Sequence, residues 1–214
     1  MIKACIFDLD GVLVDTAKYH FEAWKRLADE LGITITAEDN EKLKGVGRLE
    51  SLDIILSMGG IHLDETKRVE LAEKKNAWFV DYVNEMKAEE IFPGVLKLLT
   101  DLKKNNFRIA LASSSKNAMT VIGKLGIKSW FEVIVDGNMI KNSKPDPEIF
   151  LTAAKKLGVQ PEECVVIEDA EAGVEAAKRA GMKCVGIGNL SQLHQADKVV
   201  NQTGELNVAM LATT

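Results

Sequence analysis

The sequence has few cysteines, no dense basic tract and no long apolar run, and each shortage excludes a class of protein. Its three cysteines, Cys5, Cys164 and Cys184, all lie in apolar, strand-like segments. Their odd number and the lack of CxxC spacing argue against disulfides and zinc sites, so we expect buried free thiols. Lys and Arg are scattered and the formal net charge is -5, which argues against nucleic-acid or anionic membrane partners.

No segment approaches the ~18 consecutive apolar residues of a membrane-spanning helix. The N-terminus also enters a strand-like segment directly, without the long apolar region of a secretory signal. We therefore expect a cytoplasmic protein, and a monomer by default. The 214 residues, of which 46% are hydrophobic, suffice for a sizeable core in one or two domains.

Short apolar runs alternate with segments of helical periodicity along most of the chain. Strands that alternate with helices imply right-handed βαβ units and a parallel sheet, and the continuous apolar runs fit strands that are covered on both faces. Residues 15–88 instead look helical, with interruptions at 45–47 and 59–60. We therefore predict an α/β core with a helical insertion after the first strand. The predicted strands are 2–7, 109–112, 133–135, 165–167 and 185–187, followed by a short one at 199–200.

Polar residues stand at the ends of the predicted strands. Asp8 and Asp10 follow the first strand, Ser113 the second, and Glu168 and Asp169 a later one. In a parallel α/β sheet, sites form outside the carboxyl ends of the strands, so these groups should converge. Lys144, which we expect at the start of a helix over 144–158, should join them. The alternative is that the aspartates are turn residues and that Glu168 and Asp169 cap a helix.

A cluster of Asp8, Asp10, Glu168 and Asp169 would gather four negative charges, of which Lys144 offsets one. Such a cluster needs a divalent cation, and hard oxygen ligands suit Mg²⁺. The cation and Lys144 could then hold a phosphoryl group, with Ser113 donating to its oxygens. One aspartate can attack phosphorus as a nucleophile, and a second carboxyl can serve as general acid and base.

These residues carry a resemblance to a known family. Asp8-Leu9-Asp10-Gly11-Val12, Ser113, Lys144-Pro145 and Glu168-Asp169 resemble the four motifs of the haloacid dehalogenase-like phosphotransferase superfamily. The resemblance implies a Rossmann-like core, residues 1–14 and 89–214, with a helical cap domain, residues 15–88. It also implies that Asp8 is the nucleophile, that Asp10 is the acid and base, and that Ser113 and Lys144 bind the transferring phosphoryl group. Mg²⁺ would be held by Asp8, Asp10, Glu168 and Asp169.

Two further stretches, residues 44–51 and 110–117, are similar to the β-phosphoglucomutase family, as are His20, Trp24 and Lys75-Asn76. This resemblance implies interconversion of β-D-glucose 1-phosphate and glucose 6-phosphate, with glucose 1,6-bisphosphate as activator and intermediate. Thr16 and His20 would act beside the nucleophile loop. The residues expected to bind substrate are Trp24, Lys44, Gly45, Val46, Arg48, Ser51, Lys75, Ser115, Lys116 and Asn117.

A mutase that works through a bisphosphate needs two phosphate sites, whereas a phosphatase needs one. Arg48 and the segment 115–117 could clasp the second phosphate, because the Arg fork binds phosphate in a bidentate manner. Several alternatives remain at this stage. Arg48, Lys75 and the other basic residues could be solvated, and His20 and Trp24 could be packing residues. Gly47 and Ser114 depart from the residues common in the family, so the sugar preference is open.

Two other functions also remain open. The chain could be a sugar-phosphate phosphatase of the same fold, using Asp8 and Asp10 with water completing the reaction. It could instead be a non-enzymatic binding or regulatory protein that kept the fold.

Overall fold

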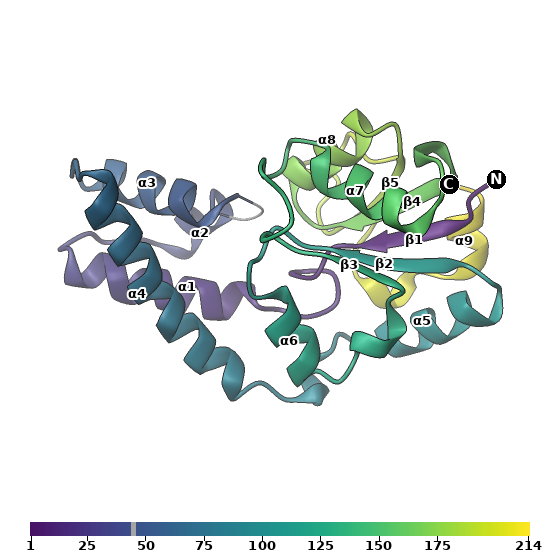
Figure 1. The fold of residues 1–214 in the computed structure, drawn as a ribbon, viewed down its shortest axis with the longest axis horizontal. Coiled ribbons are helices and arrows are strands. Elements are labelled where there is room, and N and C mark those ends of the chain that lie inside the picture. Colours follow the sequence, from purple (N-terminus) through teal and green to yellow (C-terminus); the bar gives the residue numbers. More distant parts are fainter. Residues whose placement is uncertain (44–45) are drawn as a thin grey trace.

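The computed structural model describes residues 1–43 and 46–214, and a six-stranded sheet lies at its centre (Figure 1). All strand pairs are parallel, in the order β3-β2-β1-β4-β5-β6. The order reverses between β1 and β4, which is where open α/β sheets form their crevice. The strands are β1 (Ala4–Phe7), β2 (Arg108–Ala112), β3 (Val133–Val135), β4 (Cys164–Glu168), β5 (Lys183–Ile187) and β6 (Lys198–Val200).

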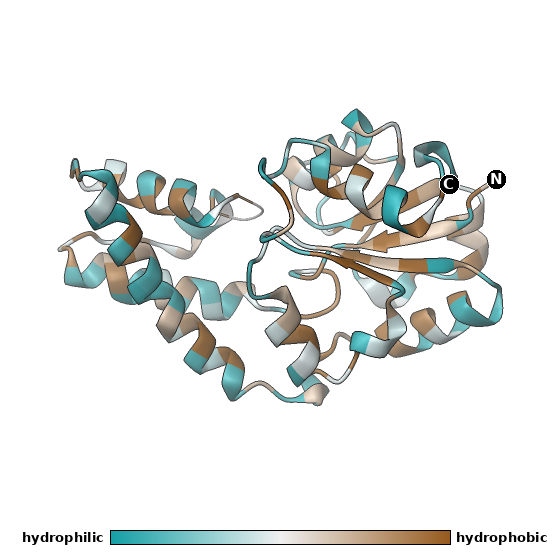
Figure 2. Cartoon of the chain, in the orientation of Figure 1, coloured by the Kyte–Doolittle hydropathy of each residue, from teal (hydrophilic) through white to brown (hydrophobic). Residues whose placement is uncertain are grey.

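Helices cover both faces of this sheet, so the predicted parallel α/β core is confirmed (Figure 1). Because successive side chains of a strand point to opposite faces, Ala4 and Ile6 of β1 pack on one face, while Cys5 and Phe7 pack on the other. The first face meets α7 (Glu148–Leu157) and α8 (Glu171–Arg179). The second meets α5 (Val95–Lys104), α6 (Ala118–Lys124) and α9 (Val208–Ala212). The apolar strands between these layers are visible in Figure 2.

Four helices follow β1 and lie beside the sheet rather than on its faces (Figure 1). They pack around an apolar cluster of their own, centred on Trp24, Leu27 and Leu52. Asp64 begins the longest of them, because its carboxylate accepts a hydrogen bond from the Lys67 backbone N–H at 2.8 Å. These helices are α1 (Ala17–Glu30), α2 (Ala37–Glu41), α3 (Arg48–Met58) and α4 (Glu65–Asn84).

The chain leaves and re-enters the sheet region through two adjacent segments. Val14 and Ile91 form an antiparallel bridge, which places the two crossings side by side. Glu90 ties them further, since its carboxylate binds Lys18 Nζ at 2.7 Å and accepts a hydrogen bond from the Tyr19 hydroxyl at 2.6 Å. The helical insertion is therefore anchored where it begins and where it ends.

Most predicted elements are present, but one helix boundary is wrong. α7 begins at Glu148 and not at Lys144, and Pro147 is its N-cap residue. The residue before a proline avoids the helical region of backbone space, so the two prolines of this segment delay the helix start. Lys144 therefore lies in a loop. The short α9 at the end of the chain was not predicted.

The three cysteines are free and buried, as predicted, in β1, β4 and β5. Within the described part of the chain, every helix is too short or too polar to cross a membrane.

Candidate active site

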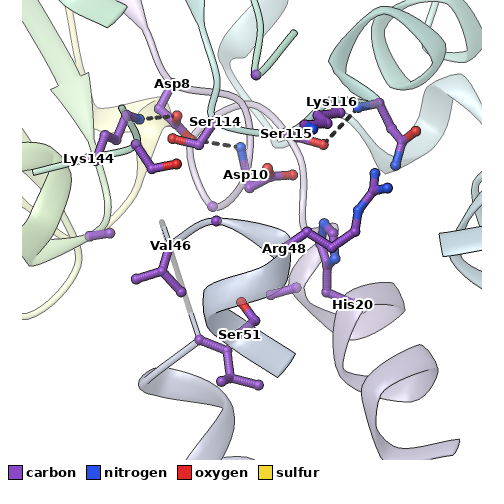
Figure 3. Close-up of a pocket in the computed structure, with 18 of the residues that line it drawn as sticks. Asp8, Asp10, His20, Val46, Arg48, Ser51, Ser114, Ser115, Lys116 and Lys144 are labelled. Carbon is purple, nitrogen blue, oxygen red and sulfur yellow. Dashed lines mark hydrogen bonds and ion pairs between the residues drawn. The ribbon is translucent and has the colours of Figure 1, made fainter. Parts of the chain in front are cut away.

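A pocket of about 1090 Å³, open solvent included, lies between the four inserted helices and the carboxyl ends of the core strands (Figure 3). Residues far apart in the sequence meet there. The predicted site residues that line it are Asp8, Asp10, His20, Trp24, Val46, Arg48, Ser51, Lys75, Ser115, Lys116, Asn117, Lys144, Glu168 and Asp169. Lys44 and Gly45, which were also expected to bind substrate, lie outside the described residues.

The loop after β1 presents the two aspartates to the pocket. The backbone N–H of Asp10 donates to Asp8 Oδ2 at 3.0 Å, which fixes one carboxylate relative to the next turn of chain. Gly11 then turns the chain at a φ of +76°, a conformation that side-chain-bearing residues rarely adopt. A Cβ on Gly11 would also stand 1.9 Å from Asp169 Oδ2, so glycine allows the β1 and β4 loops to approach each other.

Lys144 lies between two carboxylates at the base of the pocket. Its Nζ is 2.5 Å from Asp8 Oδ1 and 2.5 Å from Glu168 Oε1, and all three side chains are buried. Burial disfavours the lysine charge, but Asp8 and Glu168 outweigh it and raise the pKa of Lys144. The ammonium group is therefore a fixed positive charge beside Asp8.

Burial raises the pKa values of both aspartates. It raises the pKa of Asp8 to about 6, with Lys144 opposing the shift and Glu168 adding to it. It raises the pKa of Asp10 to about 8, to which the nearby Asp8 charge contributes. Both carboxyl groups therefore hold a proton more readily than a solvated carboxyl group does, and Asp10 more so than Asp8. Two neighbouring carboxyl groups whose pKa values differ are typical of a nucleophile paired with a general acid.

Thr16 and Ser113 are buried and are not among the residues that line the pocket. The Thr16 hydroxyl donates to Asp10 Oδ1, so Thr16 holds the carboxyl group rather than a ligand. The Ser113 hydroxyl accepts a hydrogen bond from the Ser115 backbone N–H at 3.2 Å. Both hydroxyls support the residues that do face the pocket.

The helical side of the pocket holds a buried lysine. Lys75 Nζ lies 2.8 Å from His20 Nδ1 and 4.4 Å from the centre of the Trp24 ring. Burial lowers the pKa of Lys75 well below its usual range, and the nearby Arg48 charge lowers it further. His20 stacks on Phe79, with 3.9 Å between ring centres. The interpretation of Lys75 as a solvated surface residue is therefore wrong, and Trp24 is both a packing residue and part of the pocket wall.

Positive charge faces the pocket from both sides. Arg48 is half-buried at the start of α3, and its side chain extends toward the segment of Ser115 and Lys116 on the opposite wall (Figure 3). Burial lowers the pKa of Arg48. Lys116 is exposed at the pocket edge, ahead of α6. The two residues therefore bring positive charge to the pocket from different sides.

The comparison with models of protein families shows which family the chain belongs to. The model of haloacid dehalogenase-like hydrolases matches residues 2–181. The chain belongs to the haloacid dehalogenase-like hydrolase family.

Individual members of the family are similar over nearly the whole chain. The sequence is 46% identical to β-phosphoglucomutase of Bacillus subtilis over 98% of this chain and 94% of that protein. It is 38% identical to the phosphorylated carbohydrates phosphatase of Thermotoga maritima, over 85% of this chain and 83% of that protein. The crystal structure of β-phosphoglucomutase from Clostridium difficile superposes with a TM-score of 0.96 at 46% identity, covering 100% of this chain and 96% of that one. The resemblance proposed from the motifs is confirmed.

Haloacid dehalogenase-like proteins use a metal ion, and the donors in this pocket suit a hard cation. Asp8, Asp10, Glu168 and Asp169 supply only oxygen atoms, and Lys144 leaves their charge unbalanced. Among the described residues, however, no three His, Cys, Asp or Glu side chains converge closely enough to hold one ion. The four-carboxylate metal site therefore stays a prediction.

The alternative interpretation, in which Glu168 and Asp169 cap a helix, is wrong. The N-cap residue of α8 is Ala170, not Glu168 or Asp169.

The pocket is also lined by residues that the sequence did not predict to be part of the site. Asn40 belongs to α2, whereas Leu43, Gly137 and Ser143 lie on loops or turns, and none of the four is part of a recognisable motif. Gly137 had one available signal, since it follows directly after a strand-end aspartate. Asn76, which the family resemblance includes beside Lys75, also lines the pocket.

Proposed function

We propose that the protein is a Mg²⁺-dependent β-phosphoglucomutase, which interconverts β-D-glucose 1-phosphate and glucose 6-phosphate. One observation carries the proposal. A single pocket combines the Asp8–Asp10–Lys144 group with separate cationic groups, Arg48 and Lys116, on its two opposite walls. The high identity to the Bacillus subtilis β-phosphoglucomutase supports the same activity.

Asp8 is the group that carries the phosphoryl group. In the forward direction, phosphorylated Asp8 donates it to the free hydroxyl of the bound sugar phosphate. A new O–P bond forms to the sugar, the acyl phosphate O–P bond breaks, and the Asp8 carboxylate is released. Lys144, 2.5 Å from Asp8 Oδ1, neutralises charge that develops there.

Asp10 moves the proton in each half of the reaction. It takes the proton of the attacking sugar hydroxyl, which leaves Asp10 as a carboxylic acid. It returns that proton to the departing sugar oxygen when Asp8 recovers the other phosphoryl group from the bisphosphate. The raised pKa of Asp10, about 8, supports both directions at neutral pH, because a catalytic acid–base works best near the operating pH. The Thr16 hydroxyl keeps this carboxyl in one orientation.

A second phosphate-binding site explains why the bisphosphate stays bound while it reverses its orientation in the pocket. Arg48, with the segment Ser115–Asn117, binds the phosphate that is not being transferred, as a paired donor set facing the pocket. The carboxylates of the Asp8 and Asp169 loops would hold Mg²⁺, which when bound would neutralise charge at the transferring phosphoryl group. Glucose 1,6-bisphosphate acts as both activator and intermediate.

Residues 15–88 act as a cap domain over the core formed by 1–14 and 89–214. Closure of this cap excludes water, which otherwise hydrolyses the acyl phosphate. The crossings tied by Glu90 are the hinges of this motion. We further propose that the enzyme works as a monomer in the cytoplasm. The chemistry described above does not depend on either property.

The second candidate is a sugar-phosphate phosphatase. The Thermotoga maritima relative, a phosphorylated carbohydrates phosphatase that is 38% identical over 85% of this chain, favours it. The two functions differ only in the acceptor of the phosphoryl group, which is a sugar in one case and water in the other.

Phosphorus NMR separates the two candidates. The purified protein is given Mg²⁺, β-glucose 1-phosphate and a trace of glucose 1,6-bisphosphate. Formation of glucose 6-phosphate with little inorganic phosphate is the expected result. Inorganic phosphate released in proportion to substrate loss would establish the phosphatase instead.

A further inference from the structure

A side-chain hydrogen bond joins the inserted helices to the core at the pocket. Asn117 Nδ2 donates to Asn76 Oδ1 at 2.7 Å, and Asn76 belongs to α4. Both residues are half-buried and both line the pocket. They are 41 positions apart in the sequence, so only the cap–core arrangement brings them together.

Asn117 makes this contact in place of a local one. It is the N-cap residue of α6, a position where an asparagine side chain usually accepts a hydrogen bond from its own helix. Here the side chain makes no such bond and reaches toward α4. The orientation of the Asn117 amide is therefore set by the cap rather than by α6.

The orientation of this amide matters for an anion. A carboxamide presents an NH₂ group on one side and a carbonyl oxygen on the other, and only the NH₂ group attracts phosphate. Because Asn76 accepts one of the two N–H groups, it fixes the nitrogen on the cap side of the pocket and leaves the second N–H available. A freely rotating amide would present its oxygen for part of the time.

Among the described residues, side chains of the core contact the backbone of this segment. Asn117 N–H donates to Ser115 Oγ at 3.2 Å, and Asn138 Nδ2 donates to the Lys116 carbonyl oxygen at 3.0 Å. The Asn117 side chain is thus the part of this segment that responds to the position of α4.

We propose that Asn76 is a positioning residue, which orients the Asn117 amide for the non-transferred phosphate and makes that phosphate site depend on cap position. The proposal rests on the proposed function for the identity of the ligand. It predicts that loss of Asn76 weakens phosphate binding only through Asn117.

A double-mutant cycle with a binding readout tests the proposal. Glucose 6-phosphate binding is measured by calorimetry for the wild-type protein, Asn76→Ala, Asn117→Ala and the double variant. We expect each single change to weaken binding about 2- to 12-fold, the effect of one hydrogen bond. The double variant should bind no more weakly than Asn117→Ala. Wild-type affinity in Asn76→Ala, or losses that multiply in the double variant, would overturn the proposal.

Asp81→Ala, at an exposed position of α4, is the matched control and should bind as the wild type does. If Asn76→Ala lowers the melting temperature, Asn76→Leu replaces it, because leucine keeps a similar volume and lacks the acceptor. A merely structural role would leave product partition unchanged, whereas we expect Asn76→Ala to release more inorganic phosphate per turnover. The binding measurement does not need turnover, so the two proposals can fail separately. A wild-type protein that binds glucose 6-phosphate but makes only inorganic phosphate would refute the mutase activity. The double-mutant cycle would still decide the role of Asn76.

Discussion

Replacement of Lys144 by methionine should destabilise the fold strongly, although the lysine belongs to the active site. The Lys144 side chain is 1% exposed, and its partners Asp8 and Glu168 are 8% and 1% exposed. Methionine keeps the length of the chain but removes the charge, which leaves two buried carboxylates without their cation. Breaking a buried ion pair from one side costs about 3–5 kcal/mol. We expect a loss of this size in the free energy of unfolding at pH 7.5.

Urea unfolding in the presence of EDTA measures this loss without interference from metal ions. At a slope of about 3 kcal/mol per M, the midpoint should move down by roughly 1 to 2 M. Lys97→Met is the matched control, because Lys97 pairs with Asp101 at 2.7 Å but its side chain is 81% exposed. An exposed pair of this kind contributes about 0.2–1 kcal/mol. Equal losses in the two variants would refute the view of Lys144 as a buried counter-charge.

The pH dependence of the Lys144→Met variant has a definite sign. Burial already raises the folded-state pKa of Asp8 to about 6, and loss of the lysine charge raises it further. Between the unfolded pKa of about 3.9 and the folded value, the folded protein binds more protons than the unfolded chain. Its stability therefore falls as pH rises through this window. The deficit relative to the wild type should be smallest near pH 4 and largest above pH 7, and a deficit independent of pH would contradict the assignment to Asp8.

Three further substitutions test other parts of the account. Asp10→Asn should lower the rate of phosphoryl transfer to the sugar by about 10²- to 10⁴-fold, the usual contribution of acid–base catalysis. Binding of Mg²⁺ and phosphate, measured by calorimetry, should persist. Near-normal turnover would exclude Asp10 as the acid and base. Arg48→Ala should weaken glucose 1,6-bisphosphate binding by about 1.5–3 kcal/mol and leave acetyl phosphate hydrolysis nearly unchanged, so equal losses in the two assays would argue against a second phosphate site. Gly11→Ala should lower both thermal stability and Mg²⁺ affinity, because the new Cβ meets Asp169 Oδ2 at 1.9 Å. Its control is Gly126→Ala, which has a similar φ of +71° but open space around it, and should lose stability alone.

The layout of the core could be predicted because most strands contain a short apolar run that ends at a polar residue. Asp8, Asp10, Glu168 and Asp169 follow such runs, and parallel strands bring their carboxyl ends to one edge. This argument uses only local periodicity and the rules of parallel sheets. It identified Asp8, Asp10, Lys144, Glu168 and Asp169, whereas the other predicted residues that line the pocket were expected only from the family resemblance.

The direction of individual side chains could not be predicted in the same way. Thr16 and Ser113 stand beside pocket residues in the sequence, yet both are buried and bind neighbouring groups. Small rotations of the backbone after a strand decide whether a hydroxyl faces the pocket. The same sequence information therefore fits either outcome.

Contacts between the inserted helices and the core were also beyond the sequence. The Asn76–Asn117 hydrogen bond depends on how α4 lies against α6, and neither helix has a pattern that encodes this arrangement. The loop position of Lys144 depends on two prolines that delay α7. The five-residue α9 is too short to show helical periodicity.

The central claim is that Asp8 carries the phosphoryl group, and peptide mapping of the phosphoenzyme tests it most directly. The wild-type protein is mixed with Mg²⁺ and acetyl phosphate, quenched rapidly in acid and digested, and the peptides are analysed by mass spectrometry with fragmentation. We expect a phosphoryl group on Asp8, and none in a parallel sample of Asp8→Asn. A phosphoryl group on Asp10 or on another residue, or none on the wild-type protein while turnover proceeds, would contradict the account.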